Sequence, residues 1–192
     1  INGCCERYHP CQALTDVLTM TEHSDKPLEA LHLLYTGVQN NVSNSLVLMA
    51  DRLGFSLTLA TPEPAENQES FDADLQAMIT NNPSIMLVAD PRDAIVAADF
   101  IYTDTWIDMQ YFNDPTKHAE KTALVAQMQR FQINADLIAG HELKIMHDMP
   151  IHNDYEITEA AVRDPRSIIF DQAANRLHAQ KGLLYWLLVA NT

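Results

Sequence analysis

The chain has few cysteines, and all of them lie at one end. Cys4, Cys5 and Cys11 fall within the first eleven of 192 residues. An odd number confined to one end does not form a disulfide framework, so we expect a reducing compartment, the cytoplasm. A metal cluster of these thiols with His9 is disfavoured, because no second ligand pair follows at zinc-finger spacing. We therefore predict no metal site.

Positive charge is also scarce. Lys and Arg number 12 against 26 Asp and Glu, which gives a formal net charge of −14. Such a field repels nucleic acid and anionic membranes. No run approaches the roughly 20 apolar residues of a membrane span, and no basic segment precedes a signal-cleavage pattern. We expect no nucleic acid and no membrane as partner, and nothing indicates secretion.

Two nucleotide-binding signatures are missing. The loop after the first expected strand contains Gly37 where a dinucleotide fingerprint needs three glycines. No glycine-rich loop ends in Gly-Lys-Ser/Thr, the pattern that cradles nucleotide phosphates. NAD binding and nucleotide hydrolysis are therefore disfavoured, and no cofactor is expected.

Strand-like and helix-like segments alternate along the chain with short connections. This alternation predicts parallel strands joined by right-handed crossovers and covered on both faces. The predicted fold class is α/β, a Rossmann-like three-layer sandwich with a mainly parallel sheet. Expected strands are 31–36, 55–60, 85–89, 100–103, 143–146 and 167–170. Expected helices are 10–23, 41–53 with Gly54 as C-cap, one capped by Ser70 and running to about 80, 91–97, 116–130, 135–139 closed by Gly140, one from 158, and 171 to about 189.

Polar loops follow four of the expected strands directly. They open with Gly37, Asp104, His147 and Asp171, after strands 31–36, 100–103, 143–146 and 167–170. In an open α/β sheet, ligands bind beyond the carboxyl ends of the strands, where such loops converge. The sequence therefore predicts a site at this edge of the sheet.

Five motifs follow one another along the chain. They are HPCQ at 9–12, YTG at 35–37 with NNV at 40–42 and NS at 44–45, YTDTW at 102–106, H-x-x-P at 147–150, and FD at 170–171 leading to NRLHAQK at 175–181. In order and spacing these motifs resemble the ornithine carbamoyltransferases of the aspartate/ornithine superfamily. The resemblance covers nearly the whole chain, but only the second half of such an enzyme. The Ser-x-Arg-Thr-Arg loop that binds phosphate in the family's first domain has no counterpart here.

The resemblance implies a domain organisation and an assembly. Residues 1–25 would be an interdomain helix carrying HPCQ, 26–170 the acceptor-binding α/β domain, and 171–192 a helix that packs on the N-terminal domain. The family's enzymes work in arginine metabolism as homotrimers. They move the carbamoyl group of carbamoyl phosphate to the side-chain amine of ornithine or a related basic amine. Because half of the donor site is absent, the isolated chain is expected to be inactive.

The resemblance also implies residue roles. His9 and Arg176 would donate to the carbamoyl oxygen, while Gln12 and the backbone carbonyl near Met149-Pro150 would hold the carbamoyl amide. Asn41 with Asn40 would hold the acceptor's carboxylate, and Asp104 with the residue at 108 its α-ammonium, which a carboxylate binds by charge-assisted hydrogen bonds. The implied catalytic residues are His9, Gln12, Arg176, His147 and Asp148, and the implied substrate-binding residues are Asn40, Asn41, Asp104, Asp108, Met109, Met149 and Pro150.

Two departures from the family's pattern add negative charge to the acceptor pocket. Where the family reads Asp-x-x-x-Ser-Met-Gly, residues 104–110 read DTWIDMQ, with Asp108 for Ser and Gln110 for Gly. Where it reads His-Cys-Leu-Pro, residues 147–150 read HDMP, with Asp148 for Cys. We expect an acceptor more cationic than ornithine or differently shaped, or a pocket that no longer catalyses.

Each candidate residue has a plainer interpretation when it is taken alone. His9 and Asn41 are placed to cap or pack at the helices they precede, and Asp171 is placed as an N-cap. Asp104 suits a solvated turn, and Arg176 an ion pair on its own helix. The joint pattern favours the site.

Three alternative functions stay open. A metal site at His147-Asp148 with His152 and Asp154 fits no known template. A non-catalytic binding or regulatory protein could keep this fold. Aspartate carbamoyltransferase is the nearest enzymatic alternative, but Asp104 and Asp108 would repel its dicarboxylate acceptor.

Overall fold

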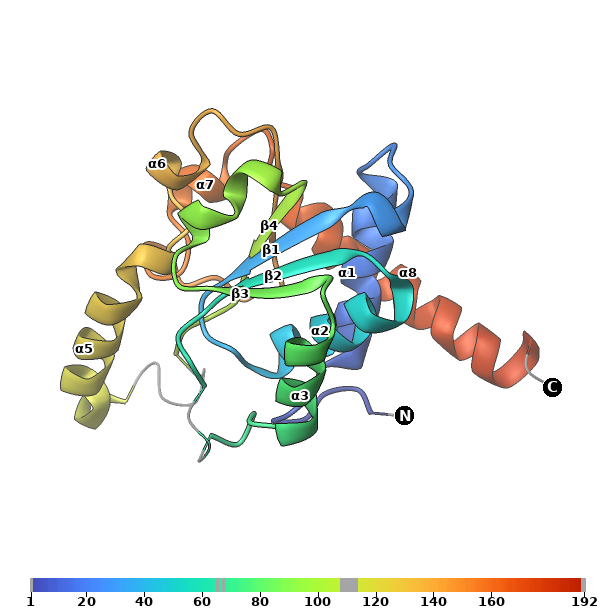
Figure 1. Cartoon of the computed structure of the whole chain (residues 1–192), viewed down its shortest axis with the longest axis horizontal. Helices are drawn as coiled ribbons and strands as arrows, with labels where there is room; N and C mark the ends of the chain where they lie inside the picture. The colour runs from blue at the N-terminus through green and yellow to red at the C-terminus, as the bar shows by residue number, and fades with distance from the viewer. Residues whose placement is uncertain (1, 65, 67, 108–113, 191–192) are drawn as a thin grey trace.

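A computed structural model gives the fold, and it describes residues 2–64, 66, 68–107 and 114–190. Five strands form one sheet in the order β3-β2-β1-β4-β5, and every pairing is parallel (Figure 1). The order reverses between β1 and β4, which is where open α/β sheets bind ligands. The predicted Rossmann-like fold is thereby confirmed. The strands are β1 (His32–Thr36), β2 (Ser56–Ala60), β3 (Ile85–Val88), β4 (Phe100–Thr103) and β5 (Lys144–His147).

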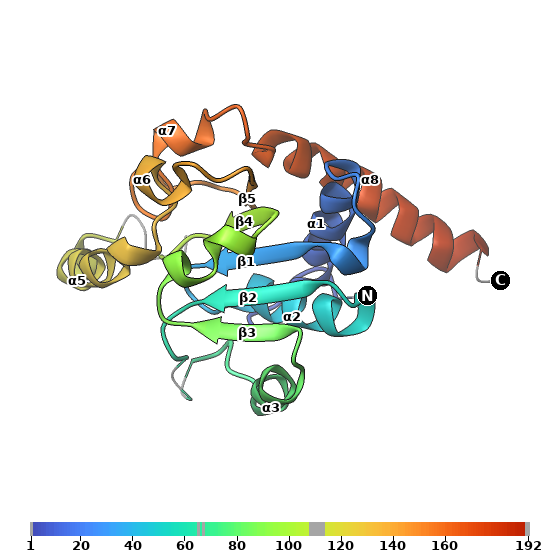
Figure 2. The same ribbon diagram turned by 45° about the horizontal axis from the view of Figure 1, so that its top comes forward.

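Helices cover both faces of the sheet, because the central strands are apolar on both sides. In β1, Leu33 and Tyr35 pack with α1 and α2, while Leu34 packs with the helices of the opposite face. On the first face lie α1 (Pro10–Glu22), α2 (Asn41–Leu53) and α3 (Ala73–Asn81), and α8 (Ile169–Tyr185) packs alongside α1 (Figures 1 and 2). The opposite face carries η2 (Pro91–Asp93), η3 (Ile95–Ala97), α5 (His118–Met128), α6 (Ala135–Ile138) and α7 (Glu159–Val162). Short turns of helix η1 (Leu28–Ala30), η4 (Pro115–Lys117), η5 (Gln129–Phe131) and η6 (Trp186–Ala190) complete the described elements.

The helix α2 has the bounds that its end signals predict. Asn40 is its N-cap, and its side-chain oxygen accepts from the backbone N–H groups of Val42 and Ser43. The Ser43 hydroxyl in turn accepts from the Asn40 backbone N–H, which completes a capping box. Gly54 ends the helix at φ 81°, a left-handed conformation that favours glycine. This cap fixes Asn40 and Asn41 at the carboxyl end of β1.

Three expectations about local structure were wrong. Residues 167–170 form no strand: Ser167 makes one isolated parallel bridge with Ile145, and α8 begins at Ile169. Asp171 therefore lies in the first turn of α8 instead of capping it, 3.4 Å from His23 Nε2. The helix α3 is capped by Asp72 and not by Ser70. The carboxyl edge thus gathers three of the four expected strand-end loops.

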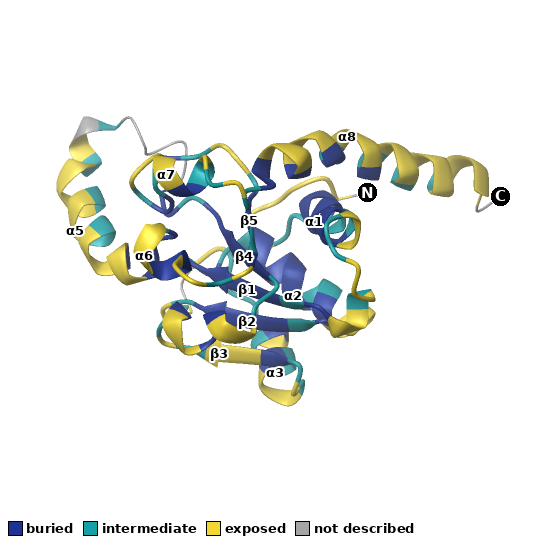
Figure 3. Cartoon of the chain, turned by 90° about the horizontal axis from the view of Figure 1, so that it is seen from above, coloured by how far each residue is buried: buried dark blue, intermediate teal, exposed yellow. Residues whose placement is uncertain are grey.

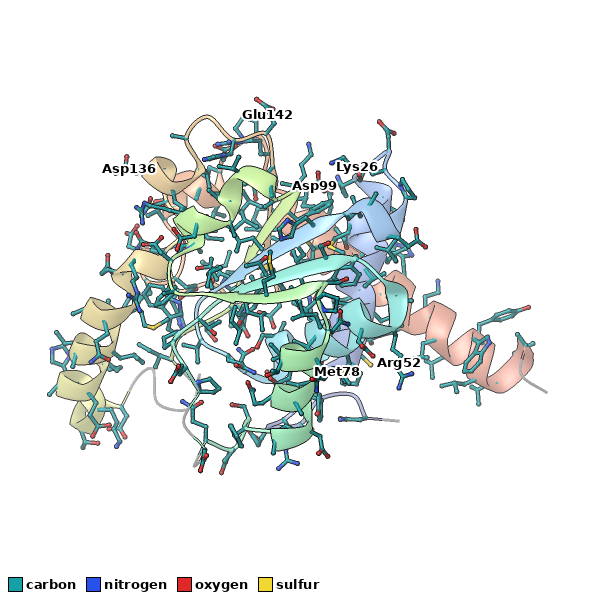
Figure 4. The ribbon with its side chains drawn as sticks, viewed as in Figure 1. Lys26, Arg52, Met78, Asp99, Asp136 and Glu142 are labelled. Atoms are coloured by element: carbon teal, nitrogen blue, oxygen red, sulfur yellow. The ribbon has the colours of Figure 1, made fainter. Side chains whose placement is uncertain are left out.

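At the amino edge of the sheet, away from those loops, Lys26 meets Asp99 (Figure 4). Lys26 Nζ lies 2.5 Å from Asp99 Oδ1, and the other Asp99 oxygen accepts from the His32 backbone N–H at 3.0 Å. This carboxylate joins the start of β1 to the start of β4. Because the pair is partly exposed, its contribution to stability is small.

The C-terminal end of α8 extends beyond the sheet and is exposed (Figures 2 and 3). Its apolar side chains lie uncovered: Leu184, Tyr185, Trp186, Leu188 and Val189 are 48–70% exposed. Among the described residues, no helix has the length and apolar character to cross a bilayer.

Candidate active site at the carboxyl edge of the sheet

A cavity of about 510 Å³ opens where β1 and β4 end. Asn40, Asn41 and Asp104 line it, together with Trp106 and Ser70. Asp104 is only 6% exposed, so it is not a solvated turn residue. The Asn40 amide donates to Asp104 Oδ2 at 2.6 Å, and the Thr105 backbone N–H donates to Oδ1 at 2.6 Å. These bonds hold the buried Asp104 carboxylate beside the amides of Asn40 and Asn41. Such groups can bind the ammonium and the carboxylate of an amino acid.

Gly37 lets the β1 loop pass close to this cavity. Its φ is 134°, and a Cβ there would lie 3.1 Å from Trp106 Nε1 and 3.2 Å from Thr103 Oγ1. Both the backbone conformation and the space therefore favour glycine. The close approach packs the loops after β1 and β4 against each other.

A second cavity, of about 390 Å³, lies between the start of α1 and α8. His9 and Arg176 line it, along with Cys4 and Cys11. His9 Nδ1 and Arg176 Nε are buried and find no hydrogen-bond partner among the described residues. Burial and the nearby Arg176 cation lower the pKa of His9, which favours its neutral form. His9 and Arg176 thus bring nitrogen groups to the wall of a cavity that an oxygen-rich ligand could fill.

A polar seam joins α1 and α8 beneath this second cavity. Gln12 accepts a hydrogen bond from Arg176, so Arg176 does not pair with an acid on its own helix. One turn further, Asp16 Oδ1 accepts from the side-chain amides of Gln12 and Gln172, both at 2.7 Å. We name the side chains of Gln12, Asp16, Gln172 and Arg176 the α1–α8 seam.

Asp16 is fully buried, and burial raises its pKa to about 7 although both amide bonds oppose the shift. The ordinary value is 3.8. The contribution of this shift to stability is therefore complete below that value and is lost as the pH rises through about 7.

His147, at the end of β5, is fully buried and holds the next loop. The backbone N–H of Met149 donates to its Nδ1 at 2.9 Å, so Nε2 carries the proton and donates to Glu156 Oε1 at 3.1 Å. The same Glu156 oxygen accepts from the His152 backbone N–H at 2.6 Å. These bonds shape the turn in which Met149 has φ 60° and the Met149-Pro150 bond is cis. His147 thus positions the loop that carries the implied carbamoyl-binding carbonyl.

Asp148 lies beside Asp104. One oxygen each from Asp104 and Asp148 and one His147 nitrogen lie within 4.8 Å of one another. Burial, followed by the negative charge of Asp104 and a hydrogen bond with it, raises the pKa of Asp148 well above its ordinary range. Asp148 Oδ1 is buried without a partner among the described residues. Asp148 therefore favours its protonated, neutral form beside Asp104.

The metal hypothesis named different partners from those that the structure assembles. It joined His147 and Asp148 to His152 and Asp154, whereas the group with metal-like spacing among residues 2–64, 66, 68–107 and 114–190 contains Asp104 in their place. His147 Nδ1 in that group already accepts from a backbone N–H. Two carboxyl groups remain, and these suit an ammonium as well as a metal ion.

The structure thus gathers the predicted site residues into two neighbouring groups. Arg176 links them, because its charge acts on His9 and also lowers the pKa of Asp148.

Asp108 and Met109 lie outside the described residues. The sequence alone did not predict Asp16, Gln172 and Glu156 as site residues. Asp16 could have been found, because it follows Gln12 by four residues and so lies on the same face of the helix. The donor-side group is His9, Gln12 and Arg176, and the acceptor-side group is Asn40, Asn41, Asp104 and Asp148, with His147, Met149 and Pro150 in the adjoining loop.

Fold and site together define an α/β ligand-binding domain whose pocket lies at the carboxyl edge of a parallel sheet. Residues 29–187 match the family model of the aspartate/ornithine carbamoyltransferase Asp/Orn binding domain. The chain belongs to this family.

Relatives from distant organisms agree with this assignment. Ornithine carbamoyltransferase of Nitrobacter winogradskyi is 39% identical over 99% of the chain and 59% of its own length. That of Methanococcus maripaludis is 39% identical over 97% of the chain and 61% of its own length. The chain therefore spans about three fifths of these curated relatives, as the resemblance to a second half implied.

Solved structures give the same result. Ornithine carbamoyltransferase of Thermus thermophilus superposes with a TM-score of 0.78 at 34% identity, over 97% of this chain and 58% of that one. The enzyme of Pyrococcus furiosus gives 0.79 at 35% identity, over 96% and 58%.

Proposed function

We propose that the full-length protein carrying this domain is a carbamoyltransferase. It moves the carbamoyl group of carbamoyl phosphate to the side-chain amine of ornithine or a related basic amine. The observation that carries the proposal is a pair of cavities whose lining groups act on each other electrostatically: His9 and Arg176 line one, and Asp104 lies beside two amides in the other. In this proposal the two cavities are half of a two-substrate site.

The reaction needs positioning and donors aimed at a developing negative charge. A neutral amine attacks the carbamoyl carbon, a tetrahedral oxyanion forms, and the bond to the phosphate oxygen breaks while the amine loses a proton. His9 and Arg176 donate to the oxyanion, as oxyanion-hole groups do. Gln12 and the loop at Met149-Pro150 hold the carbamoyl amide, which fixes the carbon for attack.

The acceptor amino acid lies in the 510 Å³ cavity. Asn41 and Asn40 bind its carboxylate, and Asp104 binds its α-ammonium. Asp108 and Met109 belong to the same proposal by resemblance. Asp104 beside Asp148 disfavours a dicarboxylate acceptor, so aspartate transfer is the weaker alternative.

The remaining half of the enzyme supplies the phosphate site. We propose the domain organisation that the resemblance implies: residues 1–25 as the interdomain helix, 26–170 as the acceptor domain and 171–192 as the helix that docks on the N-terminal domain. The exposed apolar side chains at the end of α8, Tyr185 and Trp186 among them, support that docking. We further propose a cytoplasmic homotrimer that acts in arginine metabolism.

Product formation by the full-length protein tests this function. With labelled carbamoyl phosphate and a panel of ornithine, lysine, putrescine and agmatine, we expect labelled product and one phosphate per turnover, and none from residues 1–192 alone. Because a more cationic acceptor would favour the ionised form of Asp148 beside Asp104, a diamine or longer basic amino acid should be preferred over ornithine. Asp148→Cys should shift that preference towards ornithine by about 10-fold, the effect of losing one charge-assisted hydrogen bond.

Asp136→Cys is the matched control, since Asp136 is exposed on α6 (Figure 4) and is not one of the residues that line the cavity. Absence of product with every amine would refute the transferase and favour a binding protein. Preference of the unaltered protein for ornithine over all other amines would refute the acceptor proposal alone.

A further inference from the structure

Asp16 has no role in the function proposed above, although it lies at the centre of the α1–α8 seam. It comes from α1, is fully buried, and bonds through one oxygen to amides from two helices. A buried carboxyl group is costly, so a protein that retains one needs it satisfied. Its second oxygen, Oδ2, is also buried, and a hydrogen-bond interaction with Tyr102 acts on this carboxyl group.

The two amide bonds to Asp16 determine which way two glutamines point. A glutamine amide has an NH2 end that only donates and an oxygen that only accepts. Because Asp16 Oδ1 accepts from Gln12 Nε2, the Gln12 oxygen must face the other way, towards Arg176. Likewise the Gln172 oxygen faces β5, where it accepts from the His147 backbone N–H at 2.8 Å.

The orientation of Gln12 matters for the carbamoyl group. That group ends in an NH2, which can only donate, so the residue that holds it must present an acceptor. A carbonyl oxygen has two lone pairs; in Gln12 one accepts from Arg176, and in the proposed reaction the second accepts from the carbamoyl NH2. A flipped Gln12 would oppose NH2 to NH2 and would release Arg176.

We propose that Asp16 is a positioning residue that locks Gln12 with its oxygen towards the carbamoyl amide and, through Gln172, holds the end of β5. The effect of this orientation on catalysis rests on the proposed carbamoyl transfer. The orientation of Gln12 by Asp16, which we call the lock, is a property of the domain itself. An inward-facing Gln12 oxygen selects an acyl phosphate that carries an NH2 group on its reactive carbonyl, as carbamoyl phosphate does. It disfavours an acyl phosphate that carries a methyl group there, such as acetyl phosphate.

The charged and titratable groups around Asp16 come from several elements. Asp148 follows β5, Tyr102 lies on β4 and Arg176 on α8, and each interacts electrostatically with Asp16. Burial raises the pKa of Asp16 to about 7, while the Arg176 cation opposes the rise. Changing the pH around neutrality therefore changes the protonation of Asp16, and signals from Gln12 and Gln172 can be followed across that range.

Two substitutions of Asp16 separate orientation from mere packing. Asp16→Asn keeps an acceptor oxygen for both glutamines and turns its NH2 towards the Tyr102 hydroxyl. Asp16→Leu keeps the volume and removes the acceptor. In the full-length protein, Asp16→Leu should lower kcat/KM for carbamoyl phosphate by about 10- to 100-fold, the effect of losing one buried hydrogen bond. KM for the amine should stay within about threefold, and discrimination against acetyl phosphate should fall.

Asp16→Asn should stay within about threefold of the unaltered protein, and its activity should lose any ionisation near pH 7. Thr15→Val is the control: Thr15 is as buried on the same helix, but its hydroxyl donates to the Cys11 carbonyl. An equal loss in Asp16→Asn and Asp16→Leu, or no loss in either, would overturn the proposal.

A spectroscopic readout needs no activity. In the full-length protein, the side-chain NH2 signals of Gln12 and Gln172 should shift together as Asp16 titrates near pH 7, and Asp16→Asn should abolish that shift. A titrating Asp16 with unmoved Gln12 signals would refute the lock. If the signals move as expected but the protein transfers no carbamoyl group, the proposed function fails and the lock stands.

Discussion

Arg176→Met in the full-length protein is expected to lower kcat/KM for carbamoyl phosphate by about 100- to 1,000-fold, the effect of removing one oxyanion donor. The substitution keeps the length of the apolar stem and removes the guanidinium. That group meets Gln12, carries a buried Nε without a partner among the described residues, and lines the 390 Å³ cavity with His9. Steady-state kinetics at saturating amine measure the loss.

The matched control for Arg176 is Arg163→Met. Arg163 is 77% exposed and pairs with Glu159 on the surface, so its loss should leave the kinetics unchanged. A fall of less than about threefold for Arg176→Met would show that this arginine does not touch the reacting group.

His147→Leu is expected to lower the free energy of unfolding by roughly 1–3 kcal/mol, the cost of leaving a buried polar group without its hydrogen-bond partner. The substitution removes the donor to Glu156 and the acceptor for the Met149 N–H, and it leaves a buried carboxylate with the His152 N–H alone. Denaturant unfolding followed by circular dichroism measures the change.

A double variant makes the cause specific. His147→Leu with Glu156→Leu removes both partners, which costs much less than leaving one unpaired, so it should recover most of the loss. His118→Leu, at an exposed position on α5, is the control. A loss below about 1 kcal/mol for the single variant would mean that the loop does not depend on this pair.

Local signals in the sequence predicted the elements that have their own end markers. Gly54 marked the end of α2, and the expected range of the helix was correct, but its N-cap is Asn40 and not Asn41, the residue that the sequence suggested. The apolar run at 167–170 was misjudged because a short apolar segment fits a strand or a buried helix start equally well. Ser167 does make one bridge to β5, but Ile169 is buried by entering α8.

The part of the site that could be predicted from the sequence is the part formed by loops that directly follow strands of the sheet. Parallel strands place the loops after β1, β4 and β5 at one edge, which predicts that Asn40, Asp104 and Asp148 are neighbours. Pairings across the fold could not be predicted in this way. Asp16 meets Gln172 only because α8 packs along α1, 156 positions later in the chain.

The central claim is that two cavities at one edge of the sheet bind the two halves of a carbamoyl-transfer reaction. A crystal structure of the full-length protein with phosphonoacetyl-ornithine, which joins both substrates in one molecule, tests it most directly. We expect the amide carbonyl of this compound against His9 and Arg176, and its amino-acid end against Asn41 and Asp104. A compound bound elsewhere, or one that touches only one of the two groups, would contradict the claim.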